Sequence, residues 1–296
     1  MSILPAALAF LVALPAAPPP PAAADGVPAL EAALDAGLAS RPPGAARAVW
    51  ASGLLRGAAY APSPLGEGAG PDPDPRFRLD AFDCVTLVET AVALGHARSV
   101  AEARVLLDDL RYDGPADFAH RNHYLEAQWL PANARKGWIE DATERIGGDL
   151  AMRGELRLTP ATWRAAERAG NVLPGLPAAS RPLGRYPVPL LPVDHLAAIA
   201  PRIPAGTVLL VVREERPWRP YRVTHLGLVV VGRDGTRYLR HASDVPGVMR
   251  VRDEPLLRFA ARTARSRAWP VVGVSLWAIR DASARAGELL GAARPR

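Results

Sequence analysis

The sequence contains a single cysteine, Cys84, among 296 residues, and this excludes any disulfide within the chain. A repeat of fixed period and a heptad pattern are also missing, which excludes repeat architectures and long coiled coils. Hydrophobic residues make up 49% of the chain and charged residues 22%, as in a globular protein with a substantial core. The length suits one large domain, or one domain with a helical addition.

Lysine is almost absent, since Lys136 is the one lysine among 36 basic residues, although the net charge is +6. This excess of arginine, with abundant Ala, Pro and Gly, is typical of a GC-rich genome, which is the favoured interpretation. The alternative is an anionic partner such as a cell-wall polymer, a membrane surface or nucleic acid. Because the basic residues are scattered, without a Lys/Arg-rich run or an aromatic ladder, nucleic acid is not expected as a partner.

Long apolar runs are confined to the N-terminus. Residues 1–24 combine an apolar stretch with Pro/Ala-rich sequence ending at Ala24, which predicts a signal peptide and a periplasmic or secreted protein. The residues before the apolar stretch include no Lys or Arg, and a disordered Pro/Ala tail is the alternative interpretation. No later segment reaches the roughly 20 apolar residues that span a bilayer, so stable membrane insertion is not expected.

Helices are expected in the first half of the chain. The periodicity predicts helices over residues 29–38 and 45–55, with Pro42 and Pro43 between them. Residues 61–76 are rich in Pro, Gly and acidic residues, which predicts a loop.

A further helix is predicted to begin at Cys84, with Asp83 as its N-cap and Gly95 as its stop. Another covers residues 100–110, and residues 111–145 mix charges with aromatics as in an irregular surface with short helices.

The second half of the chain changes character after a Pro-rich, loop-like stretch at residues 170–205. Short β-prone segments follow, with a helix predicted over residues 255–265; the strands are residues 206–212, 225–231, 236–241, 248–252 and 271–279. The second and third are joined by a tight hairpin at residues 232–235. Helices followed by an antiparallel sheet predict an α+β fold, with one domain over residues 25–285 and a tail over residues 286–296.

Cys84 lies where an acidic loop turns into a helix, and a thiol at a helix N-terminus faces the positive end of the helix dipole. That position is expected to lower its pKa and favour the nucleophilic thiolate. A cysteine nucleophile needs a base and a group that orients the base. His225 and His241 lie on two strands joined by the hairpin, so they can meet side by side. The alternatives are an inert, buried cysteine and surface or capping histidines.

Four short motifs occur in a fixed order along the chain. They are Asp83-Cys84-Val-Thr86-Leu-Val-Glu89, Arg121-Asn122-His123-Tyr124, Thr224-His225-Leu-Gly227 and His241-Ala242-Ser243. Together they resemble the N-acetylmuramoyl-L-alanine amidase-like family of the NlpC-type superfamily of papain-like bacterial cell-wall cysteine hydrolases, from about Tyr60 to the strand near Ile279. The resemblance implies a papain-like fold in which N-terminal helices, with the nucleophile at a helix start, pack on a C-terminal antiparallel sheet.

By this resemblance, Cys84 is the nucleophile, His225 the general base and His241 the orienting residue. Tyr60, in a Gly-x-x-Tyr element, is implied to contact the substrate or the oxyanion. Other motif residues are implied to contact the substrate or support the site; they are Asp83, Thr86, Arg121, His123, Tyr124 and Ser243. Trp129 follows the second motif, and ordinary packing is the alternative for it and for Tyr124. Glu89 is expected to anchor a buried hydrogen-bond network.

A metal site is the weaker interpretation of one further pattern. His120 and His123 have the i, i+3 spacing of paired metal ligands, and Asp117 is one additional candidate. No nearby cysteine or third histidine completes a zinc site, so substrate contact is favoured over metal. The cysteine mechanism implied by the resemblance requires no metal or organic cofactor.

The leading functional prediction is an amidase that cuts between N-acetylmuramic acid and L-alanine in peptidoglycan or its fragments. Its nearest rival cuts within the stem peptide, between D-glutamate and the diamino acid. The sequence is also compatible with a non-catalytic wall-binding protein that retains the fold, and with an acyltransferase or secreted toxin that uses the same triad. The sequence leaves the oligomeric state open.

Overall fold

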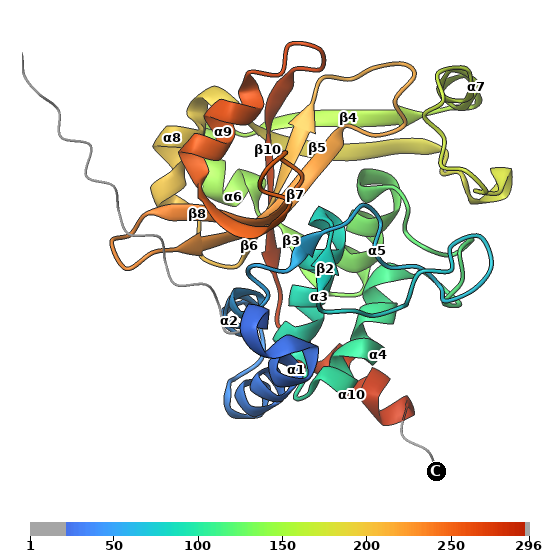
Figure 1. Cartoon of the computed structure of the whole chain (residues 1–296). Coiled ribbons are helices and arrows are strands. Elements are labelled where there is room, and N and C mark those ends of the chain that lie inside the picture. The colour runs from blue at the N-terminus through green and yellow to red at the C-terminus, as the bar shows by residue number, and fades with distance from the viewer. Residues whose placement is uncertain (1–21, 294–296) are drawn as a thin grey trace, which may run out of the picture.

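The structure, a computed structural model, describes residues 22–293 and consists of a curved sheet with helices on both faces (Figure 1). In this part of the chain the sheet has ten strands in the order β2-β1-β9-β8-β7-β6-β10-β5-β4, with β3 paired to β10. The strand pairs are antiparallel except β1 with β2, which are parallel. The strands are β1 (Ala59–Tyr60), β2 (Ala81–Phe82), β3 (Ile139–Asp141), β4 (Met152–Leu158), β5 (Gly184–Pro192), β6 (Thr207–Arg213), β7 (Val223–Val231), β8 (Arg237–Ser243), β9 (Arg250–Pro255) and β10 (Val271–Ile279).

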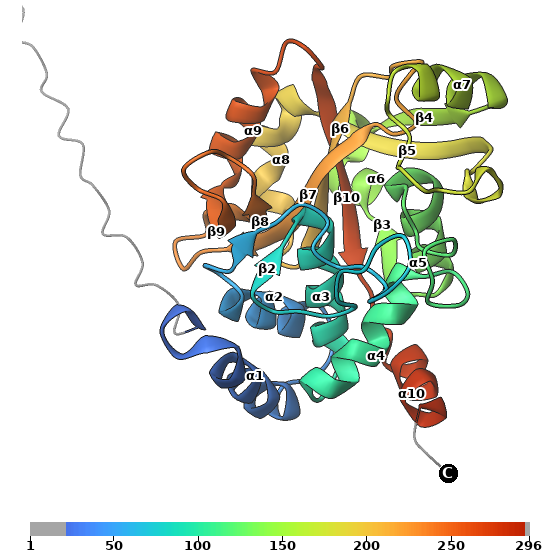
Figure 2. The same cartoon turned by 45° about the vertical axis from the view of Figure 1, so that its right-hand side comes forward.

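The helices form two layers, one on each side of the sheet (Figure 2). Helices α1 to α4 contribute to the core on one face, and α6, α8 and α9 to the core on the other. The α-helices are α1 (Ala22–Ser40), α2 (Ala45–Leu54), α3 (Cys84–His96), α4 (Val100–Arg111), α5 (Leu130–Arg135), α6 (Thr143–Gly147), α7 (Pro160–Arg168), α8 (Leu196–Ile199), α9 (Leu256–Ala264) and α10 (Ser283–Ala292). A π-helical turn, Leu125–Trp129, precedes α5. The mixed α+β fold predicted from the sequence is confirmed.

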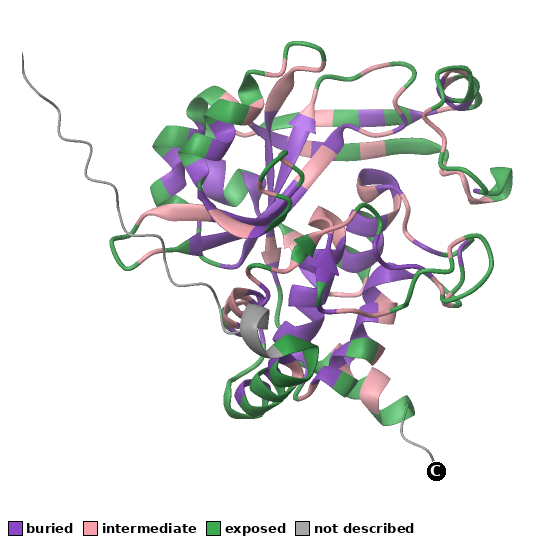
Figure 3. Ribbon diagram, viewed as in Figure 1, coloured by how far each residue is buried: buried purple, intermediate pink, exposed green. Residues whose placement is uncertain are grey.

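Strand β6 explains why the sheet needs both helix layers. Its run Val208-Leu-Leu-Val-Val212 is buried throughout (purple in Figure 3). Side chains on a strand alternate between faces, so Val208, Leu210 and Val212 join the core under α3, while Leu209 and Val211 join the core under α9. A continuous apolar run, rather than an alternating one, is the pattern of a strand covered on both faces.

Helix α3 begins at Cys84, as predicted. Asp83 accepts a hydrogen bond from the Thr86 amide at 2.7 Å, and the Thr86 hydroxyl accepts one from the Asp83 amide at 3.0 Å. This capping box fixes the start of the helix. The predicted stop at Gly95 is wrong, because the helix continues to His96. Gly95 instead permits close packing, since a Cβ atom there would lie 2.9 Å from the Ala48 side chain.

The Pro-rich stretch 170–205 is not entirely loop, and this part of the prediction is wrong. It contains strand β5, which pairs with β4 over its first seven residues. Pro187 and Pro189 are two residues apart, so their missing N–H groups lie on one edge of the strand. The other edge stays free to bond β4, which is how a strand tolerates alternate prolines.

The predicted chain ends lie partly beyond the described residues. Residues 1–21 of the predicted signal segment fall outside them. At the other end, the predicted boundary at residue 285 falls inside α10, whose Ala286 is buried. Within residues 22–293, no helix combines the length and apolar character that crossing a bilayer requires.

Candidate active site

Cys84 is the first residue of α3, and only the N-cap Asp83 separates it from strand β2. Its thiol lies near the phenol of Tyr60 and the carboxylates of Asp83 and Asp244, because each of these groups interacts electrostatically with it. The amide of Leu226, the neighbour of His225 in β7, also faces the Cys84 sulfur. The start of α3 therefore meets strand β7 at the histidine.

His225 and His241 are brought together by the pairing of β7 with β8. The Nε2 atom of His225 lies 2.8 Å from the Nδ1 atom of His241. Both rings contact Phe259 of α9, at centroid distances of 5.6 and 5.2 Å. The hairpin prediction that placed the two histidines side by side is therefore confirmed.

Two backbone features shape the strand around His225. The register between β6 and β7 shifts so that Thr224, directly before His225, is an extra residue in the ladder. Such bulges often re-aim side chains near active sites. Two residues later, a Cβ atom at Gly227 would lie 2.6 Å from the Arg240 carbonyl oxygen and 3.0 Å from the His241 Cβ. Glycine at this position therefore leaves room for His241.

A buried carboxylate stands behind the histidine pair. The Nε2 atom of His241 lies 3.3 Å from Oε2 of Glu254, in β9. Burial alone would raise the pKa of Glu254, but hydrogen bonds from Arg262 and Arg252 lower it to about 2. Glu254 is therefore ionised at neutral pH.

Both histidines are neutral at neutral pH. Burial lowers the pKa of His225 to about 4, and the negative charge of Asp244 opposes this only in part. Burial and the proximity of His225 lower the pKa of His241 to about 3, against the opposing effect of Glu254. A neutral His225 can accept a proton, as a general base must.

The predicted lowering of the Cys84 pKa is wrong. Although the residue is only half-buried, burial raises the pKa of its thiol to about 12, and the charges of Asp83 and Asp244 add to this. The amides of Leu226 and of Cys84 itself lower it only in part. Among the described residues, no hydrogen bond joins the thiol to either histidine. The free protein thus holds a neutral thiol beside a neutral imidazole.

Residues of β7 line two cavities. One, of about 470 Å³, is lined by His225, His241 and Asp244, by Arg213 of β6, by Phe259 and Arg262 of α9, and by Trp269 from the segment before β10. The other, of about 510 Å³, is lined by Val85, next to Cys84, and Val223. Its remaining walls come from His123, Tyr124, Leu125, Gly170, Asn171, Val172, Leu173, Pro174, Arg219 and Tyr221.

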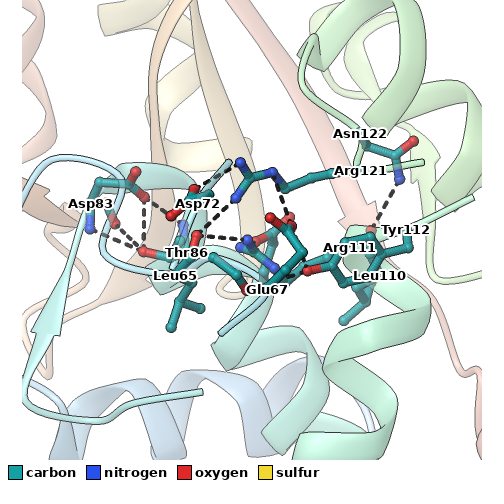
Figure 4. A network of polar contacts seen from close by, with 12 residues as sticks. Leu65, Glu67, Asp72, Asp83, Thr86, Leu110, Arg111, Tyr112, Arg121 and Asn122 are labelled. Carbon is teal, nitrogen blue, oxygen red and sulfur yellow. Dashed lines mark hydrogen bonds and ion pairs between the residues drawn. The ribbon is translucent and has the colours of Figure 1, made fainter. Parts of the chain in front are cut away.

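Arg121, one of the predicted substrate contacts, forms its hydrogen bonds to other residues of the protein (Figure 4). It donates to the Leu65 carbonyl at 2.9 Å and to Asp72 at 2.8 Å, and so holds the loop that carries these residues. Arg111 donates to the same carbonyl at 3.0 Å and to the buried Glu89 at 2.8 Å. The expectation that Glu89 anchors a buried network is confirmed.

The remaining predicted contacts divide between cavity and core. His123 and Tyr124 line the second cavity, and burial lowers the pKa of His123 to about 4. Ser243 is fully buried, and its hydroxyl has no hydrogen-bond partner in the described chain. Trp129 is also fully buried, which supports the packing alternative for it. Asp83 and Thr86 bond each other in the capping box.

The proposed metal ligands do not converge. His120 bonds Asp117 at 2.7 Å on the surface, while Nε2 of His123 lies 2.6 Å from the Phe118 carbonyl oxygen. In the part of the chain that is described, no group of three or more His, Cys, Asp or Glu side chains is arranged to hold a metal ion.

Two site residues were not found from the sequence, Asp244 and Glu254. Asp244 directly follows the His-Ala-Ser motif, so its proximity to His241 was visible, but nothing indicated that it also faces Cys84 and Tyr60. Glu254 reaches His241 only because β9 pairs with β8, with Glu254 opposite Leu239. That pairing carries no local sequence signal.

Solved structures of other proteins share the fold of this chain. The chain is similar to a Legionella pneumophila protein of the family DUF1460, with a TM-score of 0.69, 21% identity, and coverage of 86% of this chain and 96% of that one. It is also similar to an N-acetylmuramoyl-L-alanine amidase from Bacteroides uniformis, with a TM-score of 0.63, 20% identity, and coverage of 80% and 99%. No curated protein matches it.

A family match covers most of the chain. Residues 50–265, which include Cys84, both histidines and Glu254, match the AmiA-like family, described as N-acetylmuramoyl-L-alanine amidase-like. This chain therefore belongs to the N-acetylmuramoyl-L-alanine amidase-like family.

Proposed function

We propose that this protein is a cysteine amidase that hydrolyses the bond between N-acetylmuramic acid and L-alanine in peptidoglycan or its fragments. The observation that carries the proposal is the 2.8 Å contact between His225 and His241, which line one cavity, next to the Leu226 amide that faces the one cysteine of the chain. Family membership supports an amide of peptidoglycan type as the substrate. The proposal includes a papain-like, NlpC-type arrangement of the site. The position of Cys84 at the start of α3, and of the two histidines on the paired strands β7 and β8, supports it.

Acylation begins with a neutral thiol, because the Cys84 pKa is about 12. His225 removes the thiol proton as sulfur attacks the amide carbonyl, so no preformed thiolate is required. The oxyanion accepts hydrogen bonds from the Cys84 amide and the Tyr60 hydroxyl. Burial and the nearby anionic groups raise the pKa of Tyr60, so its hydroxyl keeps its proton and can donate.

Collapse of this intermediate breaks the carbon–nitrogen bond. Protonated His225 gives its proton to the leaving nitrogen, and the peptide departs with a free L-alanine amine while the lactyl carbonyl stays on sulfur as a thioester. His225 then takes a proton from water, whose oxygen attacks the thioester. The carbon–sulfur bond breaks, the acid is released, and the thiol is restored.

In the proposal, the substrate occupies the two cavities near the start of α3 and strand β7. The polar cavity beside His225 contains Asp244, Arg213 and Arg262, and the other presents Tyr124, His123 and Tyr221. One cavity would hold the sugar and the other the peptide, with the scissile amide at the start of α3. Export by a signal within residues 1–24 would place the enzyme with its substrate in the periplasm or outside the cell.

Cleavage between D-glutamate and the diamino acid is the alternative that the same machinery could perform. Mass analysis of a defined disaccharide-peptide digested by the protein distinguishes the two. The proposal predicts a peptide that begins with free L-alanine and a sugar with a free lactyl acid. A disaccharide that still carries L-Ala-D-Glu would support the alternative, and unchanged substrate would leave a wall-binding role.

A further inference from the structure

Glu254 is held as an anion by two arginines behind the histidine pair. Its side chain is 2% exposed. Its Oε2 atom lies 2.7 Å from Nη2 of Arg252 and 2.9 Å from Nη2 of Arg262, which also bonds Oε1 through Nε at 3.2 Å. A carboxylate with two charge-assisted partners stays ionised and fixed in position.

His241 presents one nitrogen to this carboxylate and the other to His225. Its Nε2 atom is 3.3 Å from Oε2 of Glu254, without the alignment of a hydrogen bond, and has no other partner among the described residues. The ring is 1% exposed, so water does not compete freely for this nitrogen. The Nε2 atom therefore lies beside an anion.

A neutral imidazole carries its proton on one nitrogen only. Beside a carboxylate oxygen, an N–H is attracted, whereas a bare nitrogen would oppose its lone pair to the negative charge. We propose that Glu254 is a positioning residue that fixes the proton of His241 on Nε2, and thereby fixes the tautomer of His225.

The consequence for His225 follows from the 2.8 Å contact. With His241 Nδ1 unprotonated, that contact requires His225 to donate through its Nε2–H. His225 Nδ1 then holds a lone pair and is the atom that accepts the thiol proton. The opposite tautomer of His241 would donate from Nδ1, force the His225 proton onto Nδ1, and block this acceptor.

The inference rests on the proposed function for its catalytic meaning, but its test is independent of activity. Nitrogen-15 NMR of histidine-labelled protein near pH 7 separates protonated from bare ring nitrogens. Loss of signals in His225→Asn and His241→Asn variants assigns the two rings. Both rings are expected to carry the proton on Nε2, and a proton on Nδ1 of His241 would overturn the inference. This measurement uses the unaltered protein, so it does not depend on any Glu254 variant folding.

The Glu254→Gln variant removes the charge at nearly constant shape. It is expected to populate the Nδ1-protonated tautomer of His241 and to lower kcat/KM by about 10- to 100-fold, as for loss of a carboxylate that orients an imidazole. Glu254→Asp, which keeps the charge, should partly restore the Nε2-protonated tautomer of His241 and part of the kcat/KM. Glu215→Gln, the same change at an exposed glutamate, is the matched control and should alter neither the His241 tautomer nor kcat/KM.

The outcomes separate the inference from the proposed function. A tautomer shift in Glu254→Gln, in a protein that cleaves no muropeptide, would support the inference and contradict the function. Unchanged tautomers in a folded Glu254→Gln variant would overturn the inference, even if the unaltered protein is an active amidase.

Discussion

The Nε2 atom of His225 lies 2.8 Å from the Nδ1 atom of His241, and burial keeps both rings neutral at neutral pH. The pair connects the junction of α3 and β7 to Glu254, whose charge is held by Arg252 and Arg262. The proposed nucleophile, base and orienting residue and the buried Glu254 thus come from α3, β7, β8 and β9. These residues are far apart in the sequence, and the pairing of β7 with β8 and of β8 with β9 brings His225, His241 and Glu254 together.

The thiol of Cys84 should react slowly with iodoacetamide at neutral pH. Because its pKa is about 12, the thiolate fraction, and with it the alkylation rate, should rise about tenfold per pH unit from pH 7 to pH 10. Intact-protein mass spectrometry over time gives the rate. Fast alkylation that is constant between pH 5 and 8 would instead indicate a preformed thiolate–imidazolium pair.

Acid should destabilise the fold through the histidine pair. The folded pKa values, about 4 for His225 and about 3 for His241, lie below the value near 6.5 expected for unfolded histidine. Between pH 6.5 and 4 the unfolded chain binds more protons than the folded one, so stability should fall as pH falls. Urea unfolding at several pH values measures this. A His241→Gln variant should show a shallower pH dependence, and an unchanged slope would contradict the assignment.

Gly227→Ala should damage both stability and activity. The added Cβ would meet the Arg240 carbonyl at 2.6 Å and the His241 side chain at 3.0 Å, so β7 and β8 must shift. Overpacking of this kind costs about 1–3 kcal/mol. Gly287→Ala, in helix α10 with no atom within 4 Å of the new Cβ, is the matched control. Equal unfolding free energies for the two variants would show that β7 tolerates the methyl group.

Glu89→Ala should strongly destabilise the protein. It leaves Arg111 buried without its 2.8 Å partner, and breaking a buried ion pair in this way costs about 3–5 kcal/mol. The loop at Leu65 should loosen as well, because Arg111 also bonds that carbonyl. Denaturant unfolding measures the loss, with exposed Glu215→Ala as the control. A loss below about 1 kcal/mol would show that solvent reaches Arg111.

The residues that sequence could locate are those with a local signal. Cys84 follows a capping residue, and the hairpin at residues 232–235 places His225 beside His241. Glu254 carries no such signal, because its approach to His241 depends on the pairing of β9 with β8 and on Arg262 from α9.

The burial of the Cys84 thiol could not be predicted from the sequence. The helix start at Cys84 predicted a lowered thiol pKa, but the contacts of Cys84 with Tyr60, Leu226 and Asp244 come from separate strands and loops. Their combined exclusion of water outweighs the amides at the helix start. In the same way, strand β5 was missed because the spacing of its prolines permits pairing on one edge.

The central claim is that Cys84 performs amide hydrolysis on a muramoyl-L-alanine bond. Its most direct measurement is the release, from a defined muropeptide, of a peptide with a free N-terminal L-alanine. The protein and a folded Cys84→Ala variant are compared. We predict steady release by the protein and none above background by the variant. Equal release by both would contradict the cysteine mechanism.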